Sequence, residues 1–443
     1  MPGPVLAAAD DPFPTYSCIE ANVAFWKKVY AQYTSSFGLI HDSRDLGIVY
    51  EVVQLQGDES RQGCETNERS VEALKEKYRR ILTSLAAGRP PVGPEETRVA
   101  ALFAAGAKAA TFQAAADSIR FQRCLSDRFQ AGLVRSGRYL GEIREIVTSY
   151  GLPADLAYLP HVESSFDYQA YSKSGAVGIW QLIKATGSRF LTINTALDER
   201  RDPILASHAA AKYLQGNYRK LQSWPLALTA YNHGLTSMLR AKNSLGSYEK
   251  IYSCYDNKSF GFASRNFYAE FLAAREIAKN YRKYFPELRL DDPVRTSSFT
   301  VNRAAGIKVL TNHLKVDLDT LAALNPALME PVWSGRSYVP KGYRLRLPIG
   351  SGGDVALAPL PPAPASTKAV QKRSPSHRVK RGETINAIAR RYGVSPRALL
   401  ASNQLSPKEA IKAGQQLRIP APEPSSAKGA KAREGGKSAK DNS

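Results

Sequence analysis

Apolar side chains recur at spacings of three and four residues through much of the stretch 139–285. This spacing places them on one face of an α-helix. Helix boundaries are marked too, because Gly151 is a helix stop and Asp202-Pro203 is typical of an N-cap followed by a first-turn proline. Pro225 is expected to begin another helix that ends at Gly234, and 264–284 a last one. The pattern predicts that 139–285 is nearly all α.

One acid falls on an apolar position of this pattern. A spacing of 3-4-3 joins Leu156, Leu159, Glu163 and Phe166. We therefore expect one helical face, kinked at Pro160, with the Glu163 carboxyl pointing inward. Burial strips a carboxylate of water and raises its pKa, and a carboxyl that stays protonated near neutral pH can donate a proton to a leaving group. The alternative is a buried structural glutamate whose carboxyl is paired with an arginine or hydrogen-bonded to a hydroxyl.

The charge of the chain limits its partners. The 443 residues carry a formal net charge of +21, which favours nucleic acid, an anionic membrane surface or an anionic polymer such as a cell wall. Because no zinc-finger spacing, phosphate loop or aromatic RNA-binding motif is present, the wall and the membrane surface are favoured and nucleic acid is not. No apolar run reaches the roughly 18–20 residues of a membrane span.

The four cysteines and the N-terminus bear on the compartment. No C-x-x-C pair joins the cysteines, so we expect no metal site, while two disulfides and four thiols both remain open. No cofactor is expected either. The run Val5-Leu6-Ala7-Ala8-Ala9-Asp10 resembles the end of a signal peptide whose earlier part is missing. We expect export from a start site further upstream; a disordered leader is the alternative.

The region before residue 138 is predicted as a helical extension. Helices are expected around the aromatic segment 25–30, at 67–87, and in two alanine-rich segments at about 95–105 and 107–130. The β-branched stretch 46–53 fits a strand or a buried helix equally well.

The C-terminal third contains an internal repeat. With an offset of 78 residues, Phe299–Arg303 aligns on His377–Arg381, and Asn325 on Asn403. The first copy is six residues longer near its end. Each copy is predicted as strand–helix–helix–strand, a size typical of a binding module. Between the copies lies a linker rich in Gly, Ala, Pro and Ser, and a low-complexity basic tail follows the second copy.

Three short motifs in the helical region resemble those of the soluble lytic transglycosylases of family 1, which have a goose-lysozyme-like fold. They are Glu163-Ser164, Gly175-Ala-Val-Gly-Ile-Trp-Gln181 and Ala230-Tyr-Asn-His-Gly234. Trp180 and the downstream repeats are similar to the membrane-bound lytic murein transglycosylase D subgroup. The motifs stand in the family's order over about 100 residues, a combination far more specific than any one of them.

The resemblance implies cleavage of the β-1,4 bond between N-acetylmuramic acid and N-acetylglucosamine in peptidoglycan, without water, to give 1,6-anhydro ends. Glu163 would be the sole acid and then base. The residues that match the family's substrate-binding positions are Ser172, Gln181, Tyr213, Tyr231, Asn232 and Tyr268. Four of these also have a structural interpretation: Ser172 as a turn or cap residue, Gln181 as a surface amide, and Tyr213 and Tyr231 as packing residues. Trp180 fits the core and a sugar-stacking platform equally well.

The repeats resemble LysM modules, which bind glycans that contain N-acetylglucosamine. In the second copy the resemblance implies glycan binding by Gly382, Thr384 and Asn403. The first copy has Ala304-Ala305-Gly306 in place of Gly-Glu-Thr, so it is expected to be a degenerate module.

The resulting hypothesis is a mainly α protein, with small α+β repeats, that acts as a monomer on peptidoglycan in the periplasm or cell envelope. Peripheral association with the envelope membrane is part of this expectation. The alternatives are a lysozyme-type hydrolase and a catalytically silent wall-binding protein. The predicted segments are a leader at 1–20, the helical extension at 21–137, the catalytic domain at 138–290, the degenerate module at 296–349, the linker at 350–375, the second module at 376–420 and the tail at 421–443.

Overall fold

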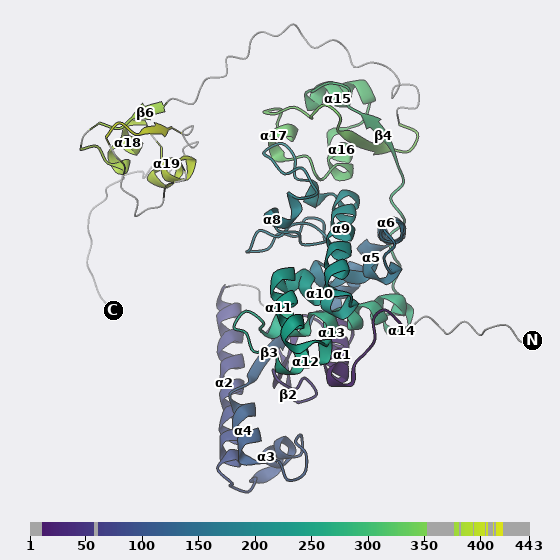
Figure 1. Cartoon of the computed structure of the whole chain (residues 1–443), viewed down its shortest axis with the longest axis vertical. Coiled ribbons are helices and arrows are strands. Elements are labelled where there is room, and N and C mark those ends of the chain that lie inside the picture. The colour runs from purple at the N-terminus through teal and green to yellow at the C-terminus, as the bar shows by residue number, and fades with distance from the viewer. Residues whose placement is uncertain are drawn as a thin grey trace, which may run out of the picture. The chain divides into compact units, whose positions relative to one another are not determined.

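The computed structural model describes residues 11–56, 61–351 and, apart from 381, 393, 404, 406–410 and 412, residues 376–419. The chain divides into two compact units, Met1–Pro361 and Pro362–Ser443. Most of the predicted linker, the whole tail and the first ten residues of the predicted leader lie outside the described residues. The described chain is mainly α-helical, as the sequence predicted (Figure 1).

The helical domain of the first unit follows the predicted pattern closely. Asp202 caps the longest of its helices, because its Oδ1 accepts hydrogen bonds of 2.9 Å from the backbone N–H groups of Ile204 and Leu205. Its elements are α6 (Leu140–Ser149), η2 (Ala154–Tyr158), α7 (Leu159–Glu163), α8 (Lys184–Gly187), η3 (Glu199–Arg201), α9 (Pro203–Leu221), α10 (Trp224–His233), α11 (Leu235–Leu245), α12 (Tyr248–Cys254), α13 (Phe262–Lys279) and α14 (Tyr281–Tyr284). Helices α9, α10 and α13 supply much of one buried core.

The stretch around Glu163 is less regular than predicted. The expected single helix is wrong: the 3-10 helix η2 is followed by the five-residue helix α7, and the chain then turns through Ser165 and Phe166 with φ of 51° and 57°. Pro160 lies in the first turn of α7, where its missing N–H costs nothing, so it separates two short helices instead of kinking one. Leu156, Leu159 and Phe166 are nevertheless fully buried, so the stripe does mark an inward face.

The N-terminal region contains a sheet as well as helices. Its elements are η1 (Ser17–Ile19), α1 (Glu20–Ala31), β1 (Phe37–Asp42), β2 (Val49–Gln54), α2 (Arg61–Ala86), α3 (Gly93–Ala100), α4 (Ala109–Ala116), β3 (Ile119–Arg123) and α5 (Ser126–Ser136). The strands form an antiparallel sheet in the order β2-β1-β3. The stretch 46–53 thus contains a strand. The predicted helix at 107–130 is wrong, because it contains α4, β3 and the start of α5.

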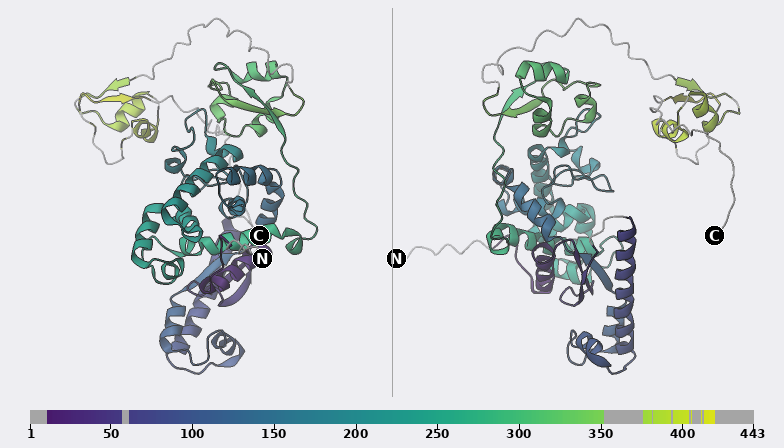
Figure 2. Two further views of the ribbon diagram at one scale, coloured as in Figure 1. Left: turned by 45° about the vertical axis from the view of Figure 1, so that its right-hand side comes forward. Right: turned by 180° about the vertical axis from the view of Figure 1, so that it is seen from behind.

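Two cores hold this region together. Helix α1 packs on α13, so its aromatic residues join the core of the helical domain. Helices α2, α3 and α4 pack with the sheet around a separate core that includes Tyr50, Tyr78 and Leu82. In Figure 2, α2 and its neighbours project away from the helical domain as a lobe of their own.

The first repeat is fixed to the helical domain. It consists of β4 (Thr296–Thr300), α15 (Ile307–Leu314), α16 (Leu318–Leu324), α17 (Glu330–Trp333) and β5 (Arg344–Pro348), with β4 and β5 antiparallel. The Asp198 N–H donates to the Ala327 carbonyl at 2.8 Å, and Leu197 belongs to the core of the repeat. A 2.6 Å ion pair joins Arg346 to Asp202, the N-cap of α9.

The second repeat lies in the other unit and is described by itself. It contains β6 (Ser376–Arg378), α18 (Ile385–Tyr392), α19 (Pro396–Ser402) and β7 (Gln416–Arg418). The strands pair antiparallel over a core that includes Ile388, Leu399 and Leu417. Among the described residues of both units, no helix combines the length and apolar character needed to cross a membrane.

Candidate active site

Glu163 opens into a cavity of about 550 Å³ in the helical domain. The residues that line it come from the end of α7, the loop before α8, α8 itself, helix α9 and the end of α10. They include six of the residues singled out in the sequence, namely Glu163, Ser172, Gln181, Tyr213, Tyr231 and Asn232. Segments separated by up to 70 residues in the sequence therefore meet around one carboxyl.

The turn after α7 holds Glu163 in place. Ser164 Oγ donates a hydrogen bond of 3.0 Å to the Ile179 carbonyl, which ties the end of α7 to the cavity loop. On the other side, Arg135 of α5 donates to the Ser165 carbonyl at 2.7 Å. Gly132 lets α5 come this close, because a Cβ there would lie 2.8 Å from the Ser165 Cβ. Neither Arg135 nor Gly132 was identified from the sequence.

The environment of Glu163 favours the protonated acid. Burial raises the pKa of Glu163 to about 8, and the nearby Glu270 carboxyl adds to this shift. A carboxyl with that pKa is mostly protonated at neutral pH, which is the state that a general acid requires. Because one side of the group faces the cavity, the proton can reach a bound ligand.

Glu270 is a second buried acid that the sequence analysis missed. It lies on α13, outside the residues that line the cavity, and accepts a long hydrogen bond of 3.4 Å from the Tyr30 hydroxyl. Burial raises its pKa to about 8 as well. The pattern that identified Glu163 could also have identified Glu270, because both are acids among the apolar residues of a buried helix. The buried neighbours of Glu270 in the sequence are Phe267, Phe271 and Ala274.

The loop that carries Ser172 is built on tight turns. The Ser172 N–H donates to the Ala176 carbonyl, and its Oγ accepts from the Ala176 N–H, both at 2.9 Å. Ser172 is therefore a turn residue that also lines the cavity, so the two interpretations of the sequence are compatible. Gly178 has a φ of 77°, and a Cβ there would lie 2.0 Å from the Arg200 carbonyl oxygen, so no side chain fits.

A buried arginine holds this loop from beneath. Arg200 Nη1 donates to the carbonyls of Gly175 and Leu182, both at 3.0 Å. Its Nη2 and Nε bind the Asp198 carboxylate at 2.7 and 2.9 Å. This bidentate pair is only 7–8% exposed, and every charged atom has a partner. The sequence analysis did not identify Arg200 or Asp198 as positioning residues.

The last two residues of the glycine-rich motif have different roles. Trp180 is fully buried and donates from Nε1 to Ser207 Oγ at 2.7 Å, so it belongs to the core and is not a sugar-stacking platform. Gln181 lines the cavity with a left-handed backbone (φ 45°), and its amide donates to the Gly178 carbonyl at 3.0 Å.

The residues of α10 close the cavity beside Glu163. The Tyr231 hydroxyl donates to the Trp180 carbonyl at 2.8 Å, and burial, with Glu163 nearby, raises the pKa of Tyr231 well above its ordinary value. The rings of Tyr213 and Tyr231 lie 5.4 Å apart. The side-chain oxygen of Asn232 accepts a hydrogen bond of 2.9 Å from Ser264 Oγ. Its amide nitrogen has no hydrogen-bond partner among the described residues, so it is free to bind a ligand in the cavity.

The structure places Tyr268 elsewhere. Its side chain is fully buried in α13, and its hydroxyl donates to the Pro14 carbonyl at 2.8 Å. Tyr268 is not among the residues that line the cavity, so its expected place in the groove is wrong. The reason is that its position on α13 faces the N-terminal segment, which the motif alone does not reveal.

Two of the predicted glycan-binding residues of the second repeat, Thr384 and Asn403, make hydrogen bonds within the repeat itself. Thr384 Oγ1 accepts from the Ala387 N–H at 3.3 Å at the start of α18, and Gly382 has a φ of 86° in the preceding turn. Asn403 donates to the carbonyls of Leu399 and Arg418 and accepts from the Arg418 N–H. Asn325 makes the equivalent three hydrogen bonds in the first repeat, so the asparagine at this position joins helix to strand in both copies.

No group of three or more His, Cys, Asp or Glu side chains in the described parts of the chain is arranged to hold a metal ion. The chemistry of the cavity is that of one protonated carboxyl surrounded by hydroxyl and amide groups.

Comparison with known proteins agrees with the motifs. Residues 143–253 match the family model of the transglycosylase SLT domain, and residues 377–420 match that of the LysM domain. The chain is 28% identical over 305 residues to membrane-bound lytic murein transglycosylase D of Escherichia coli K12, and equally to the protein of that name from E. coli O6:H1. It is 34% identical over 113 residues to a putative tributyltin chloride resistance protein of Alteromonas sp. strain M-1, which covers 25% of this chain and 55% of that protein.

The alignments with the two E. coli proteins cover 65% of this chain and 64% of each relative. The chain thus spans less than two-thirds of their length. The resemblance predicted from the sequence is confirmed: the chain carries an SLT domain and a LysM domain and is similar to membrane-bound lytic murein transglycosylase D.

Proposed function

We propose that this chain is a lytic transglycosylase that cleaves the β-1,4 bond between N-acetylmuramic acid and N-acetylglucosamine in peptidoglycan, without water, and leaves 1,6-anhydro-muramic ends. The observation that carries this proposal is Glu163, a carboxyl with its pKa raised to about 8, which is the only acid lining the cavity in the described part of the chain. The SLT match over 143–253 gives the type of chemistry.

In this mechanism Glu163 acts twice. The protonated carboxyl first donates its proton to the glycosidic oxygen, and the bond from the anomeric carbon to that oxygen breaks. The C6 hydroxyl of the same muramyl residue then bonds to the anomeric carbon, and the Glu163 carboxylate takes the hydroxyl proton. The acid is thereby regenerated, and no proton or water is consumed. A high pKa suits both steps, since it supports a protonated acid and makes the carboxylate a stronger base.

The single acid favours this reaction over hydrolysis. Lysozyme-type glycosidases use two carboxyl groups that flank the bond, one as acid and the other as nucleophile or base. Glu270 does not fill the second role here, because it lies on α13 and does not line the cavity. An intramolecular hydroxyl needs no second base, since Glu163 serves in that role.

The other cavity residues position the substrate in this proposal. Ser172, Gln181 and Asn232 present polar groups to the sugar, and Tyr213 and Tyr231 keep the surroundings of Glu163 dry. The LysM domain at 377–420 binds N-acetylglucosamine in the same glycan. We further propose that the chain is a monomeric enzyme of the periplasm or cell envelope, in peripheral contact with the envelope membrane.

Digestion of purified sacculi tests the proposal. Wild type should release muropeptides with 1,6-anhydro ends, seen by mass spectrometry, and Glu163→Gln should lose activity by about 10²–10⁴-fold, the range for removal of a general acid. Glu145→Gln is the matched control, because Glu145 is an exposed acid of α6 outside the cavity. Reducing muramic ends would show a hydrolase instead, and full activity of Glu163→Gln would show that another group is the acid.

A further inference from the structure

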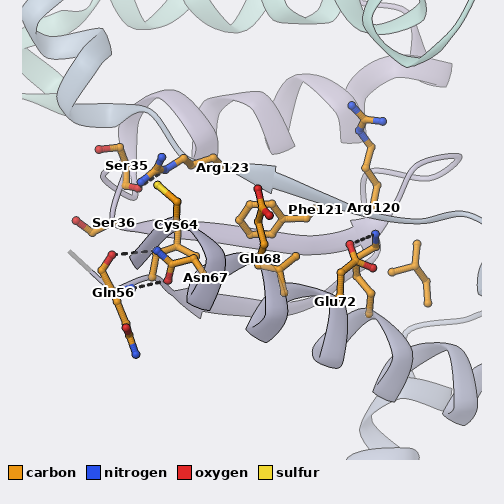
Figure 3. Close-up of a pocket in the computed structure, with 14 residues that line it drawn as sticks. Ser35, Ser36, Gln56, Cys64, Asn67, Glu68, Glu72, Arg120, Phe121 and Arg123 are labelled. Atoms are coloured by element: carbon orange, nitrogen blue, oxygen red, sulfur yellow. Dashed lines mark hydrogen bonds and ion pairs between the residues drawn. The ribbon is translucent and has the colours of Figure 1, made fainter. Parts of the chain in front are cut away.

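A second and larger cavity lies in the N-terminal region, outside the catalytic site. It measures about 970 Å³ and opens between α2 and the sheet (Figure 3). One wall is α2, where Glu68 and Glu72 follow each other at a spacing of four residues and so share a helix face. The other wall is β3, where alternation places Phe121 and Arg123 on the same face. Its volume is in the range of sites that bind small molecules and short peptides.

The aromatic floor of this cavity depends on a glycine. The Phe121 ring packs against Gly38 of the neighbouring strand β1, so closely that a Cβ on Gly38 would lie 2.1 Å from the ring. One face of the ring is therefore covered by β1. Phe121 remains half-exposed and lines the cavity, where an aromatic face attracts a cation.

Three charged side chains that line the cavity have no ion-pair partner among the described residues: Glu68, Arg123 and Arg120. The Arg120 guanidinium already lies over the Phe262 ring, 4.2 Å from its centroid, so Glu68 and Arg123 are the two that remain for a ligand. Glu72 is paired with Lys75 at 2.7 Å. Glu68, in contrast, has neither a hydrogen bond nor an ion pair among the described residues and is exposed. Arg123 uses its Nε to donate to the Ser35 carbonyl at 2.7 Å, which leaves its terminal nitrogens without a partner in the same part of the chain.

These groups define a ligand with separated charges. A carboxylate and an aromatic face together suit an ammonium group, and a guanidinium suits a carboxylate. Phe121 and Arg123 are two residues apart on β3, which separates their Cα atoms by about 7 Å. The amine and carboxyl of one free α-amino acid are too close together to reach both positions, whereas those of a short peptide are not.

We propose that this cavity binds a short peptide, with its amine at Glu68 and Phe121 and a carboxylate at Arg123. Peptides that carry a free amine and free carboxylates are the substituents of the peptidoglycan strand, so the ligand class rests on the proposed function. The site recognises the peptide part of the polymer, while the Glu163 cavity acts on its glycan.

Titration calorimetry on the full chain tests the site. The probe is the free tripeptide L-alanyl-γ-D-glutamyl-meso-diaminopimelate, compared with the same peptide acetylated on its amines. We expect the free peptide to bind, and acetylation, Glu68→Gln and Arg123→Gln each to weaken binding about tenfold or more, as expected for the loss of one charged hydrogen bond. Phe121→Leu should weaken it by a smaller factor.

Matched variants separate this inference from the proposed function. Glu76→Gln removes the same charge from α2 outside the cavity and should bind the peptide like wild type. Glu163→Gln should also bind it normally, since that residue lines the other cavity. No binding by wild type, or equal binding by Glu68→Gln and wild type, overturns the peptide site, even if sacculi are cleaved. Peptide binding without any cleavage would instead overturn the catalytic proposal and retain this one.

Discussion

A buried carboxyl whose pKa is raised reduces the stability of the fold at high pH. The folded-state pKa of Glu163, about 8, lies above its ordinary value of 4.5. The folded protein therefore binds more protons than the unfolded chain between these two values. The favourable contribution of the protonated group is fully present below pH 4.5 and is lost as the pH rises through 8. Glutamine has the shape of the protonated acid and does not ionise.

Glu163→Gln should accordingly stabilise the protein at alkaline pH while it abolishes activity. We expect a free energy of unfolding higher than that of wild type by on the order of 2 kcal/mol at pH 8.5, a figure reduced for the water that reaches the cavity, and nearly equal to it at pH 4.5. Urea unfolding at the two pH values measures this. A variant less stable than wild type at pH 8.5 would show that the Glu163 carboxylate is well accommodated in the fold.

Glu270 should tune the acid without touching substrate. Its carboxyl contributes to the raised pKa of Glu163, so Glu270→Gln should lower that pKa. Because the proposed mechanism starts from protonated Glu163, the alkaline limb of the pH–rate profile should move to lower pH, as measured by release of anhydro-muropeptides. Glu276→Gln, on the same helix but paired with Lys27, is the control and should leave the limb in place. An unchanged limb in Glu270→Gln would show that the two carboxyls are not coupled.

At the scale of elements, Arg200 connects the loop that lines the Glu163 cavity to the rest of the domain. Arg200→Met leaves the Asp198 carboxylate buried and unpaired, and releases the carbonyls of Gly175 and Leu182. We expect this to reduce the free energy of unfolding by about 3–5 kcal/mol in a urea titration, and a second change, Asp198→Asn, to recover part of the loss. If Arg200→Met alone unfolds at the wild-type urea concentration, the pair does not hold the loop.

The sequence predicts those elements whose causes are local. Helices α9 and α10 begin where Asp202-Pro203 and Pro225 place them, because the cap and the first-turn proline lie within a few residues of each start. Strand β3 was missed because its partner β1 lies about 80 residues earlier, and an alanine-rich context resembles a helix. The structure of such a segment depends on its pairing with a distant strand, and the neighbouring residues in the sequence carry no information about that pairing.

The same reasoning separates the parts of the site that were predicted from those that were not. Glu163, Gln181 and Tyr231 belong to motifs with fixed internal spacing. Glu270 and Arg200 act from neighbouring elements, and only the packing of α13 and η3 brings them to the site. Trp180 could not be assigned from sequence, because a buried indole and a sugar platform require the same residue; the hydrogen bond to Ser207 decides for the core.

At the scale of the whole molecule, the two repeats are attached differently. The first shares a core residue, backbone hydrogen bonds and the Arg346–Asp202 ion pair with the helical domain, and both lie within Met1–Pro361. The second belongs to the other compact unit and has a core of its own. The first repeat is therefore part of the same compact unit as the Glu163 cavity, and the second can act as a separate binding module.

This difference predicts how binding and catalysis separate. A chain that ends at residue 351 keeps the Glu163 cavity and the three cores of the first unit, but loses the LysM domain at 377–420. Linked modules raise the local concentration of the enzyme on its polymer, which adds up to about 10²–10⁴ in apparent affinity. We expect the shortened chain to bind sacculi at least about tenfold more weakly in a sedimentation assay.

Cleavage of a short soluble glycan gives the complementary measurement, because such a substrate fills the cavity without reaching a second module. Its rate should be the same for the shortened and full chains. Arg346→Ala in the full chain is the matched comparison, since it disturbs the attachment of the first repeat while the LysM domain stays intact. It should retain sacculus binding and lose stability, because Asp202 remains buried without its ion-pair partner. Loss of soluble-glycan cleavage on truncation would instead show that the second unit completes the catalytic cavity.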